Sequence, residues 1–184
     1  MMVTRQSHVL MIGSNARKSG KTTLICRLLN TYGKRYSIVA IKTALYDDKH
    51  KFRIHYPMAM NLDYLEIGEK GTISNKDSGK YLKSGADESW FLASTMENVY
   101  SVVEKIGKLS QNGKFMVLES TTLRKYIVPE AMVMLYQHNG EQKDRDLKVA
   151  SYADLWVKTG SEAFNNIENY IQIQNNTWKL RADI

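Results

Sequence analysis

The chain contains little cysteine, little proline and no long apolar run. Cys26 is the only cysteine among 184 residues, so an internal disulfide cannot form, and a reducing, cytoplasmic setting is expected. Because Cys26 falls on a segment with helical spacing, it is expected to pack rather than to act as a nucleophile. No stretch is long enough to cross a bilayer, and no signal-peptide pattern is present. The hydrophobic content of 43% and the two prolines fit a globular domain rather than a disordered chain.

Positive charge is concentrated in the first part of the chain. Residues 1–55 hold eleven Lys and Arg against two acids, a net charge of +9, and the remainder holds fifteen basic and seventeen acidic residues, a net charge of −2. A concentrated positive field suits an anionic ligand such as a nucleotide. The sequence shows no motif typical of DNA- or RNA-binding proteins, so nucleic acid is not the expected partner.

The charged segment includes a run that resembles a phosphate-binding loop. In the pattern G-x-x-x-x-G-K-[ST], backbone N–H groups surround a phosphate, the Lys reaches its outer oxygens and the hydroxyl holds Mg²⁺. Gly20, Lys21 and Thr22 fit this pattern, whereas Asn15 stands where Gly is usual. Asn is a tolerable replacement, since it adopts left-handed backbone conformations more readily than most residues. The residues predicted to contact the nucleotide from this loop are Asn15, Ala16, Lys18, Ser19, Gly20, Lys21, Thr22 and Thr23.

The surroundings of the loop favour this interpretation. Residues 8–12 form a short apolar run that predicts a buried strand. After Thr22, apolar residues at helical spacing predict a helix that ends near Gly33. Strand, loop and helix thus follow in the order that a phosphate site requires, with the positive end of the helix at the loop. The alternative is a polar helix start with a Thr cap.

The rest of the chain alternates between predicted strands and helices. Residues 37–43 predict a second strand, so residues 8–43 are expected to form a βαβ unit with a parallel strand pair. Residues 44–76 are a long polar excursion, with short strands expected near 52–56 and 63–67. Further strands are expected at 88–93, 115–119, 131–136 and 154–158, and helices at 77–84, 95–109 and 162–173. We therefore predict one α/β domain over residues 1–184, with the three-layer P-loop NTPase fold and a mainly parallel central sheet flanked by helices.

Three polar residues outside the loop are candidates for the same site. Glu119 follows four apolar residues at the end of a predicted strand, where an acid can hold Mg²⁺ with Thr22. Lys42 ends another strand and is predicted to meet phosphate or a substrate carboxylate, unless it is only solvated. Asp77 is expected to cap a helix, with a role in positioning water or a metal-bound ligand as the alternative. The loop 159–162 follows the last predicted strand and is placed to touch a nucleobase.

Several segments in order resemble the molybdopterin-guanine dinucleotide biosynthesis protein B family. They are residues 39–43 (VAIKT), 76–78 (KDS) followed by 84–86 (SGA), and 117–120 (VLES), and the resemblance covers residues 8–136. It implies a P-loop NTPase of the group that includes dethiobiotin synthetase and signal-recognition GTPases. Such a protein binds GTP with Mg²⁺, hydrolyses it weakly and assists attachment of a nucleotide to the molybdenum cofactor, often as a dimer.

The resemblance also implies roles for matching residues. Lys21 and Thr22 would hold phosphate and Mg²⁺, Glu119 would be the strand-end acid, and Asp77 the acid of the middle of the chain. Lys21, Glu119 and Asp77 are therefore the residues expected to act in catalysis. The chain departs from the family pattern at Asn15 and at Ser120, where Gly is usual.

Three functions fit these observations. The first is a GTP-binding accessory protein of molybdenum-cofactor type, with slow turnover and a protein partner from a cofactor pathway. The second is an ATP-dependent small-molecule kinase or ligase of the dethiobiotin-synthetase type, in which Arg17, Lys18 and the 44–76 excursion form a substrate site for an anionic compound. The third is a nucleotide-dependent switch without catalysis. All three require GTP or ATP and Mg²⁺.

Overall fold

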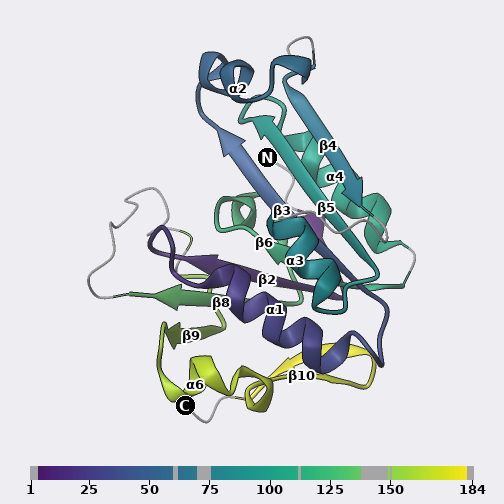
Figure 1. Ribbon diagram of the computed structural model, residues 1–184, viewed down its shortest axis with the longest axis vertical. Helices are drawn as coiled ribbons and strands as arrows, with labels where there is room; N and C mark the ends of the chain where they lie inside the picture. Colours follow the sequence, from purple (N-terminus) through teal and green to yellow (C-terminus); the bar gives the residue numbers. More distant parts are fainter. Residues whose placement is uncertain are drawn as a thin grey trace.

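A seven-stranded sheet organises the chain in a computed structural model that describes residues 4–59, 62–69, 76–111, 113–137, 149 and 151–181. Its strand order is β4-β5-β3-β6-β2-β8-β9 (Figure 1). The strands in this order are Tyr64–Glu69, Glu88–Thr95, Ile38–Tyr46, Phe115–Glu119, Val9–Ser14, Ala131–Tyr136 and Leu155–Lys158. Neighbouring strands are parallel throughout, except that β4 runs antiparallel to β5. The expectation of an α/β fold with a mainly parallel central sheet is confirmed.

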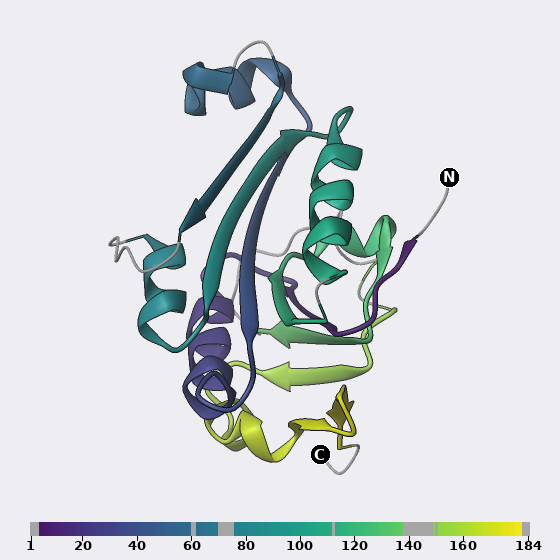
Figure 2. The ribbon, with the colours of Figure 1, turned by 90° about the vertical axis from the view of Figure 1, so that its right-hand side faces the viewer.

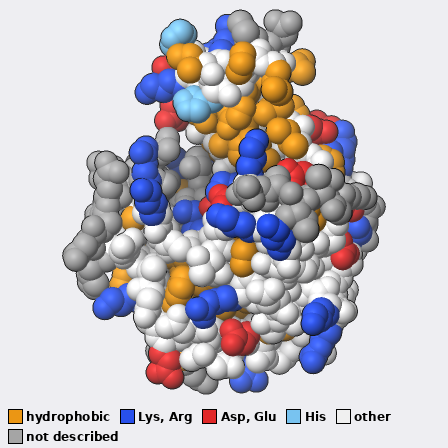
Figure 3. All heavy atoms as spheres, in the orientation of Figure 1, with side chains coloured by type: hydrophobic (Ala, Val, Ile, Leu, Met, Phe, Trp, Pro, Cys, Tyr) orange, Lys and Arg blue, Asp and Glu red, His pale blue; other side chains and the backbone are white. Residues whose placement is uncertain are grey.

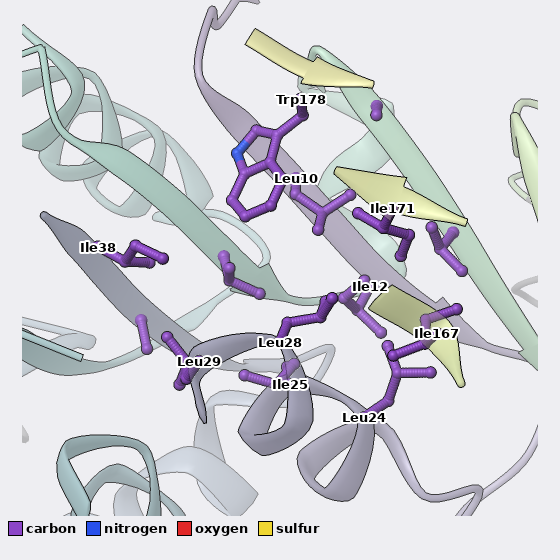
Figure 4. Close-up of a cluster of buried hydrophobic side chains, with 14 of the residues drawn as sticks. Leu10, Ile12, Leu24, Ile25, Leu28, Leu29, Ile38, Ile167, Ile171 and Trp178 are labelled. Carbon is purple, nitrogen blue, oxygen red and sulfur yellow. The ribbon is translucent and has the colours of Figure 1, made fainter. Parts of the chain in front are cut away.

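Helices cover both faces of the sheet. Helices α1 (Lys21–Tyr32) and α3 (Asp77–Lys83) lie on one face and α4 (Val99–Ser110) lies on the other, as Figure 2 shows. The alternation of side chains along a strand supplies both cores. From β2, Leu10 and Ile12 pack with α1 (Figure 4). Val9 and Met11 of the same strand pack with α4 on the other face.

The strands at the centre of the sheet are arranged differently from the expected βαβ pair. Strands β2 and β3 are parallel but not neighbours, because β6 lies between them. Ile12 of β2 and Lys42 of β3 are both register partners of Glu119. Strand pairing therefore brings the carboxyl ends of β2, β6 and β3 together, and places Glu119 in the middle.

The excursion at 44–76 continues the sheet beyond this edge. Strand β3 runs on to Tyr46, pairing past Lys42 with β5 and not with β6. We call β4, β5, this end of β3, helix α2 (Lys49–His55) and the 3-10 turn η1 (Pro57–Ala59) the wing. The strand expected near 63–67 is confirmed as β4, whereas residues 52–56 lie mostly on α2. The reason is the cap: the Asp48 carboxylate accepts from the backbone N–H of His50 at 2.7 Å and favours helix over strand.

The predicted helix at 162–173 is wrong in its second half. A short helix α6 (Glu162–Asn165) and a 3-10 turn η4 (Ile167–Asn169) precede a hairpin of β10 (Ile171–Gln174) and β11 (Thr177–Leu180). The turn residues Asn175 and Asn176 have φ values of 50° and 58°. Two adjacent left-handed residues make the turn that joins two-residue hairpins, and Asn tolerates this conformation. The Asn-Asn pair was the sequence signal for a hairpin here.

The other expected helices and strands are present within a few residues of their predicted bounds. Short elements complete the chain: β1 (Thr4–Arg5) pairs with β7 (Ile127–Val128), and η2 (Thr122–Lys125) follows β6. The predicted cap of α3 is corrected, because Lys76 is the N-cap residue and Asp77 lies in the first turn. Within the described part of the chain, no helix is both long and apolar enough to cross a membrane.

The C-terminal hairpin should contribute strongly to stability. The side chain of Trp178 on β11 is 2% exposed, and its ring centroid lies 5.5 Å from that of Phe115. Its indole N–H donates to the carbonyl of His8 at 2.9 Å. We expect Trp178→Ala to lower the free energy of unfolding by about 3–5 kcal/mol in urea titrations. The matched control is Trp156→Ala, at a residue that is 40% exposed, and it should lower the free energy of unfolding far less. Equal decreases in the two variants would show that the hairpin is not part of the core.

Candidate functional site

A pocket of about 460 Å³ opens where β2, β6 and β3 end. It brings together most of the predicted site residues, and Asn15, Ala16 and Thr23 do not line it. Its lining residues are Arg17, Lys18, Ser19, Gly20, Lys21, Thr22, Lys42, Asp77 and Glu119. In Figure 3 basic and acidic side chains meet in the hollow at the middle of the molecule. Sequence reasoning thus located this pocket, although it assigned Arg17 to a substrate site and not to the nucleotide-binding residues.

The loop between β2 and α1 owes its shape to two left-handed residues. They are Lys18, with φ of 53°, and Gly20, with φ of 84°. A Cβ atom at Gly20 would also lie 3.0 Å from the ring of Phe164. Gly20 is therefore required both by its backbone conformation and by the close approach of α6.

Asn15 does not use the left-handed conformation that would make Asn a tolerable replacement for Gly, since its φ is not positive. The backbone N–H of Asn15 donates to the carbonyl of Leu135 at 3.2 Å. Its side-chain oxygen accepts from the backbone N–H of Gln137 at 3.3 Å. The first bond belongs to the last residue pair of β2 and β8, Ser14 with Leu135, and the second holds the Asn15 side chain to the residue after β8. Asn15 thus anchors the start of the loop to the sheet, a role that Gly could not fill with a side chain.

The start of α1 presents hydrogen-bond donors to the pocket. The first intrahelical bond runs from the Leu24 N–H to the Gly20 carbonyl, so the amides before Leu24 precede the helical ladder. The helix has no acid of its own in its first turn, where the positive end of the helix dipole favours an anion. The Ser19 hydroxyl is buried and has no hydrogen-bond partner among the residues that the structure describes. A buried polar group without a partner is costly, and a bound phosphate oxygen would satisfy it.

Lys21 and the loop 159–162 both make hydrogen bonds to the segment that runs from the end of β2 to α1. The Lys21 ammonium donates to the Ser14 hydroxyl at 2.9 Å, which holds the Lys side chain back over the loop. The Thr159 hydroxyl donates to the Ser19 carbonyl at 2.8 Å. The loop after β9 therefore directly supports the loop between β2 and α1. Its predicted contact with a nucleobase stays a prediction.

Glu119 is a carboxylate with three side-chain neighbours in the pocket. It is 7% exposed. Its Oε2 accepts from the Thr22 hydroxyl at 3.3 Å and from the Tyr81 hydroxyl, and its Oε1 lies 3.5 Å from the Lys42 ammonium. Because a buried charge is costly unless it is paired, these donors are what keep a carboxylate at this position.

Tyr81 is a site residue that sequence reasoning missed. Burial, reinforced by the charge of Glu119, raises the pKa of the Tyr81 hydroxyl well above its ordinary value, so it stays protonated and donates. The available signal was its position four residues after Asp77 on a predicted helix, since residues at this spacing share a helix face.

Lys42 and Asp77 form an ion pair at the side of the pocket. Burial alone would lower the pKa of Lys42, but the carboxylates of Glu119 and Asp77 outweigh it and raise that pKa above its ordinary value. Burial would raise the pKa of Asp77, but hydrogen bonds from Lys42 and Lys80 lower it below 3.8. Both side chains are therefore charged at neutral pH, and neither points unpaired into the pocket.

The oxygens of Thr22 and Glu119 are spaced as ligands of one Mg²⁺ would be. Two ligands at adjacent octahedral positions, each about 2.1 Å from Mg²⁺, are about 3 Å apart, and the observed separation is 3.3 Å. Within the described ranges, no group of three or more His, Cys, Asp or Glu side chains lies close enough to hold a metal ion. A Mg²⁺ ion here would need further oxygens from phosphate and water, which is its usual mode of binding to proteins with nucleotides.

The ion pair of Asp77 predicts a pH dependence of stability. Since its folded-state pKa is depressed, Asp77 stabilises the fold above 3.8, and this contribution is lost as the pH falls through the folded-state value. We expect Asp77→Asn to lower the free energy of unfolding at neutral pH, and the difference from wild type to shrink at acidic pH. Urea unfolding over a pH series measures this difference. The control is Glu97→Gln, at an exposed ion pair with Lys49, which should change the free energy of unfolding little at any pH. If Asp77→Asn lowers the free energy of unfolding by the same amount at all pH values, the interpretation is contradicted.

Searches with the chain against protein-family models, curated proteins and solved structures each returned no match.

Proposed function

We propose that the pocket of about 460 Å³ binds a nucleoside triphosphate together with Mg²⁺, and that the fold is a P-loop NTPase fold. The observation that carries this proposal is the convergence of Lys21, Thr22 and Glu119 at the start of α1, with Thr22 and Glu119 oxygens 3.3 Å apart. The buried, unpartnered hydroxyl of Ser19 in the same loop supports it.

Each side chain has a defined part in binding. The amides at the start of α1 and the Ser19 hydroxyl would donate to phosphate oxygens. Lys21 would move from Ser14 to the outer phosphate oxygens, and Lys42 would neutralise charge from the other side. Thr22 and Glu119 would hold Mg²⁺, which supplies charge neutralisation between the phosphates.

The connections between strands support the same location. The chain leaves β2 toward β3 and leaves β6 toward β8, and β2 and β6 are neighbours. Neighbouring strands whose connections depart in opposite directions create a crevice at their carboxyl ends, where open α/β sheets bind ligands. The loop and Glu119 lie at this crevice.

We propose slow hydrolysis rather than rapid turnover. Asp77 is paired with Lys42 and Lys80, and Glu119 accepts from Tyr81 and Thr22. Carboxylates held by donors in this way are poor general bases. This arrangement fits a GTP-binding accessory protein of the molybdenum-cofactor type that the sequence resembles. A protein partner and a homodimer remain predictions of that resemblance.

The second candidate is a small-molecule kinase or ligase that uses ATP. The specific observation in its favour is a second, apolar cavity that shares Lys42 and Asp77 with the nucleotide pocket. A kinase needs its acceptor beside the terminal phosphate, and phosphoryl transfer depends mainly on such positioning.

Nucleotide binding can be tested by removing the loop lysine. We expect Lys21→Ala to abolish stabilisation by GTP and ATP, because the ammonium that reaches the outer phosphate oxygens is lost. Thermal shifts with each triphosphate and diphosphate, with and without Mg²⁺, measure this. A ligand at a hundred times its dissociation constant should stabilise the wild type by about 2.7 kcal/mol.

The matched control for Lys21→Ala is Lys34→Ala, which removes an exposed lysine just beyond the other end of α1. It should respond to nucleotide as the wild type does. Unchanged nucleotide affinity in Lys21→Ala would overturn the proposed function. A clear preference for adenine nucleotides would instead favour the kinase or ligase over the accessory protein.

The metal role of Glu119 predicts a loss of Mg²⁺ dependence. We expect Glu119→Gln to bind nucleotide without Mg²⁺ about as well as the wild type, while Mg²⁺ no longer strengthens binding, because the amide is a poorer ligand for a hard cation. Titration of a fluorescent nucleotide with and without Mg²⁺ measures the ratio of dissociation constants. The control is Glu130→Gln, which makes the same substitution outside the pocket. If Mg²⁺ still strengthens nucleotide binding fully in Glu119→Gln, then Glu119 is not a ligand of the metal.

A further inference from the structure

A second cavity, of about 390 Å³, lies between the wing and α3. It shares two residues with the nucleotide pocket, Lys42 and Asp77, so the two cavities meet at this ion pair. Their contact follows from the length of β3, which passes Lys42 and carries the wing beyond the carboxyl edge of β6.

The walls of this cavity are mostly apolar. They come from the segment after α2, from β4 and from β5, and the apolar lining side chains are Tyr56, Met58, Leu65, Ile67 and Phe91. Met58 is 83% exposed and Ile67 is 37% exposed, so large apolar side chains stand open to solvent at the cavity. Figure 3 shows the apolar surface of this upper part of the molecule. A concave apolar site of this size is typical of a small-molecule site.

The polar part of the lining carries charges of both signs in equal number, from Lys42, Lys76, Asp77 and Glu69, beside His55 and Ser78. The ion pair of Lys42 and Asp77 lies where this cavity meets the other pocket. The Lys42 ammonium donates hydrogen bonds, and the Asp77 carboxylate accepts them. An anionic ligand group would be repelled by Asp77, and a cationic group by Lys42. A neutral group that both accepts and donates, as a hydroxyl does, is complementary to both side chains.

We propose that this cavity binds a neutral small molecule with an aromatic or branched apolar body and a hydroxyl at the end that faces Lys42 and Asp77. The apolar walls bind the body, and the ion pair orients the hydroxyl. The position of that hydroxyl beside a terminal phosphate rests on the proposed function, whereas binding in the cavity does not.

A matched pair of fluorescent probes tests the proposal on the full chain without nucleotide. The probes are 2-naphthol and 2-methoxynaphthalene, which share an aromatic body and differ in that the methyl ether cannot donate a hydrogen bond. Fluorescence titration should show saturable binding of 2-naphthol. The ether should bind about tenfold more weakly, since it cannot donate to the charged acceptor Asp77. Equal affinities would overturn the proposed role of the ion pair, and absence of 2-naphthol binding would overturn the site.

Two substitutions in the wall locate the bound probe. Ile67→Glu and Met58→Glu place a carboxylate in the apolar lining and should each weaken 2-naphthol binding by about tenfold or more. Ile54→Glu and Leu62→Glu are the controls, since both residues belong to the same region, are 63% and 68% exposed, and do not line the cavity. Equal effects of the lining and control substitutions would overturn the proposed location.

Nucleotide binding, measured in the same variants, separates this proposal from the proposed function. Ile67→Glu should retain nucleotide binding, and Lys21→Ala should retain 2-naphthol binding. If the wild type binds 2-naphthol at Ile67 but binds no nucleotide, the cavity stands and the proposed function fails. If the wild type binds nucleotide but not 2-naphthol, the proposed function stands and the proposed second site fails.

Discussion

The insertion of β6 between β2 and β3 is the constraint on which the candidate site depends. Parallel pairing on both sides fixes the register of Glu119 against Ile12 and Lys42. A one-residue slip of β6 would turn Glu119 to the opposite face of the sheet. The burial of Leu118 and Val117 in separate cores prevents such a slip. Hydrophobic packing on both faces of the sheet therefore sets the position of a polar group at its edge.

Ion pairs and hydrogen bonds then fix the positions of the charged side chains at the carboxyl edge of the sheet. Glu119 and Asp77 lie on different elements, yet Lys42 bridges them. Helix α3 adds the Tyr81 hydroxyl to Glu119, so packing of α3 on the sheet and orientation of the acid are linked. Removing one partner from a buried ionic group is usually much costlier than the net gain from forming it. The pocket is therefore organised before a ligand binds, which lowers the cost of ordering on binding.

Hydrophobic periodicity, with the residues that typically begin and end helices and strands, was enough to predict the central strands and the helices α1, α3 and α4. The same signals predicted that Lys21, Thr22, Lys42, Asp77 and Glu119 lie together at the carboxyl edge of the sheet. They were not enough to predict strand order, because pairing depends on which faces pack together rather than on local pattern. The C-terminal hairpin was missed because Ile167 and Ile171 also fit helical spacing. Tyr81 was missed because its spacing from Asp77 shows only that the two residues share a helix face, whereas its hydrogen bond to Glu119 depends on how α3 packs against the sheet.

The departure at Asn15 has a structural explanation in this arrangement. The loop is held at its start by Asn15 on Gln137 and near its end by Thr159 on Ser19, and both contacts come from the β8 and β9 side of the sheet. Lys42 and Asp77 approach from the opposite side, on β3 and α3. The pocket therefore lies between a tethered loop and an ion pair on the wing side. Since the second cavity begins at that ion pair, a ligand there would meet the pocket of about 460 Å³ through Lys42 and Asp77 rather than through the loop.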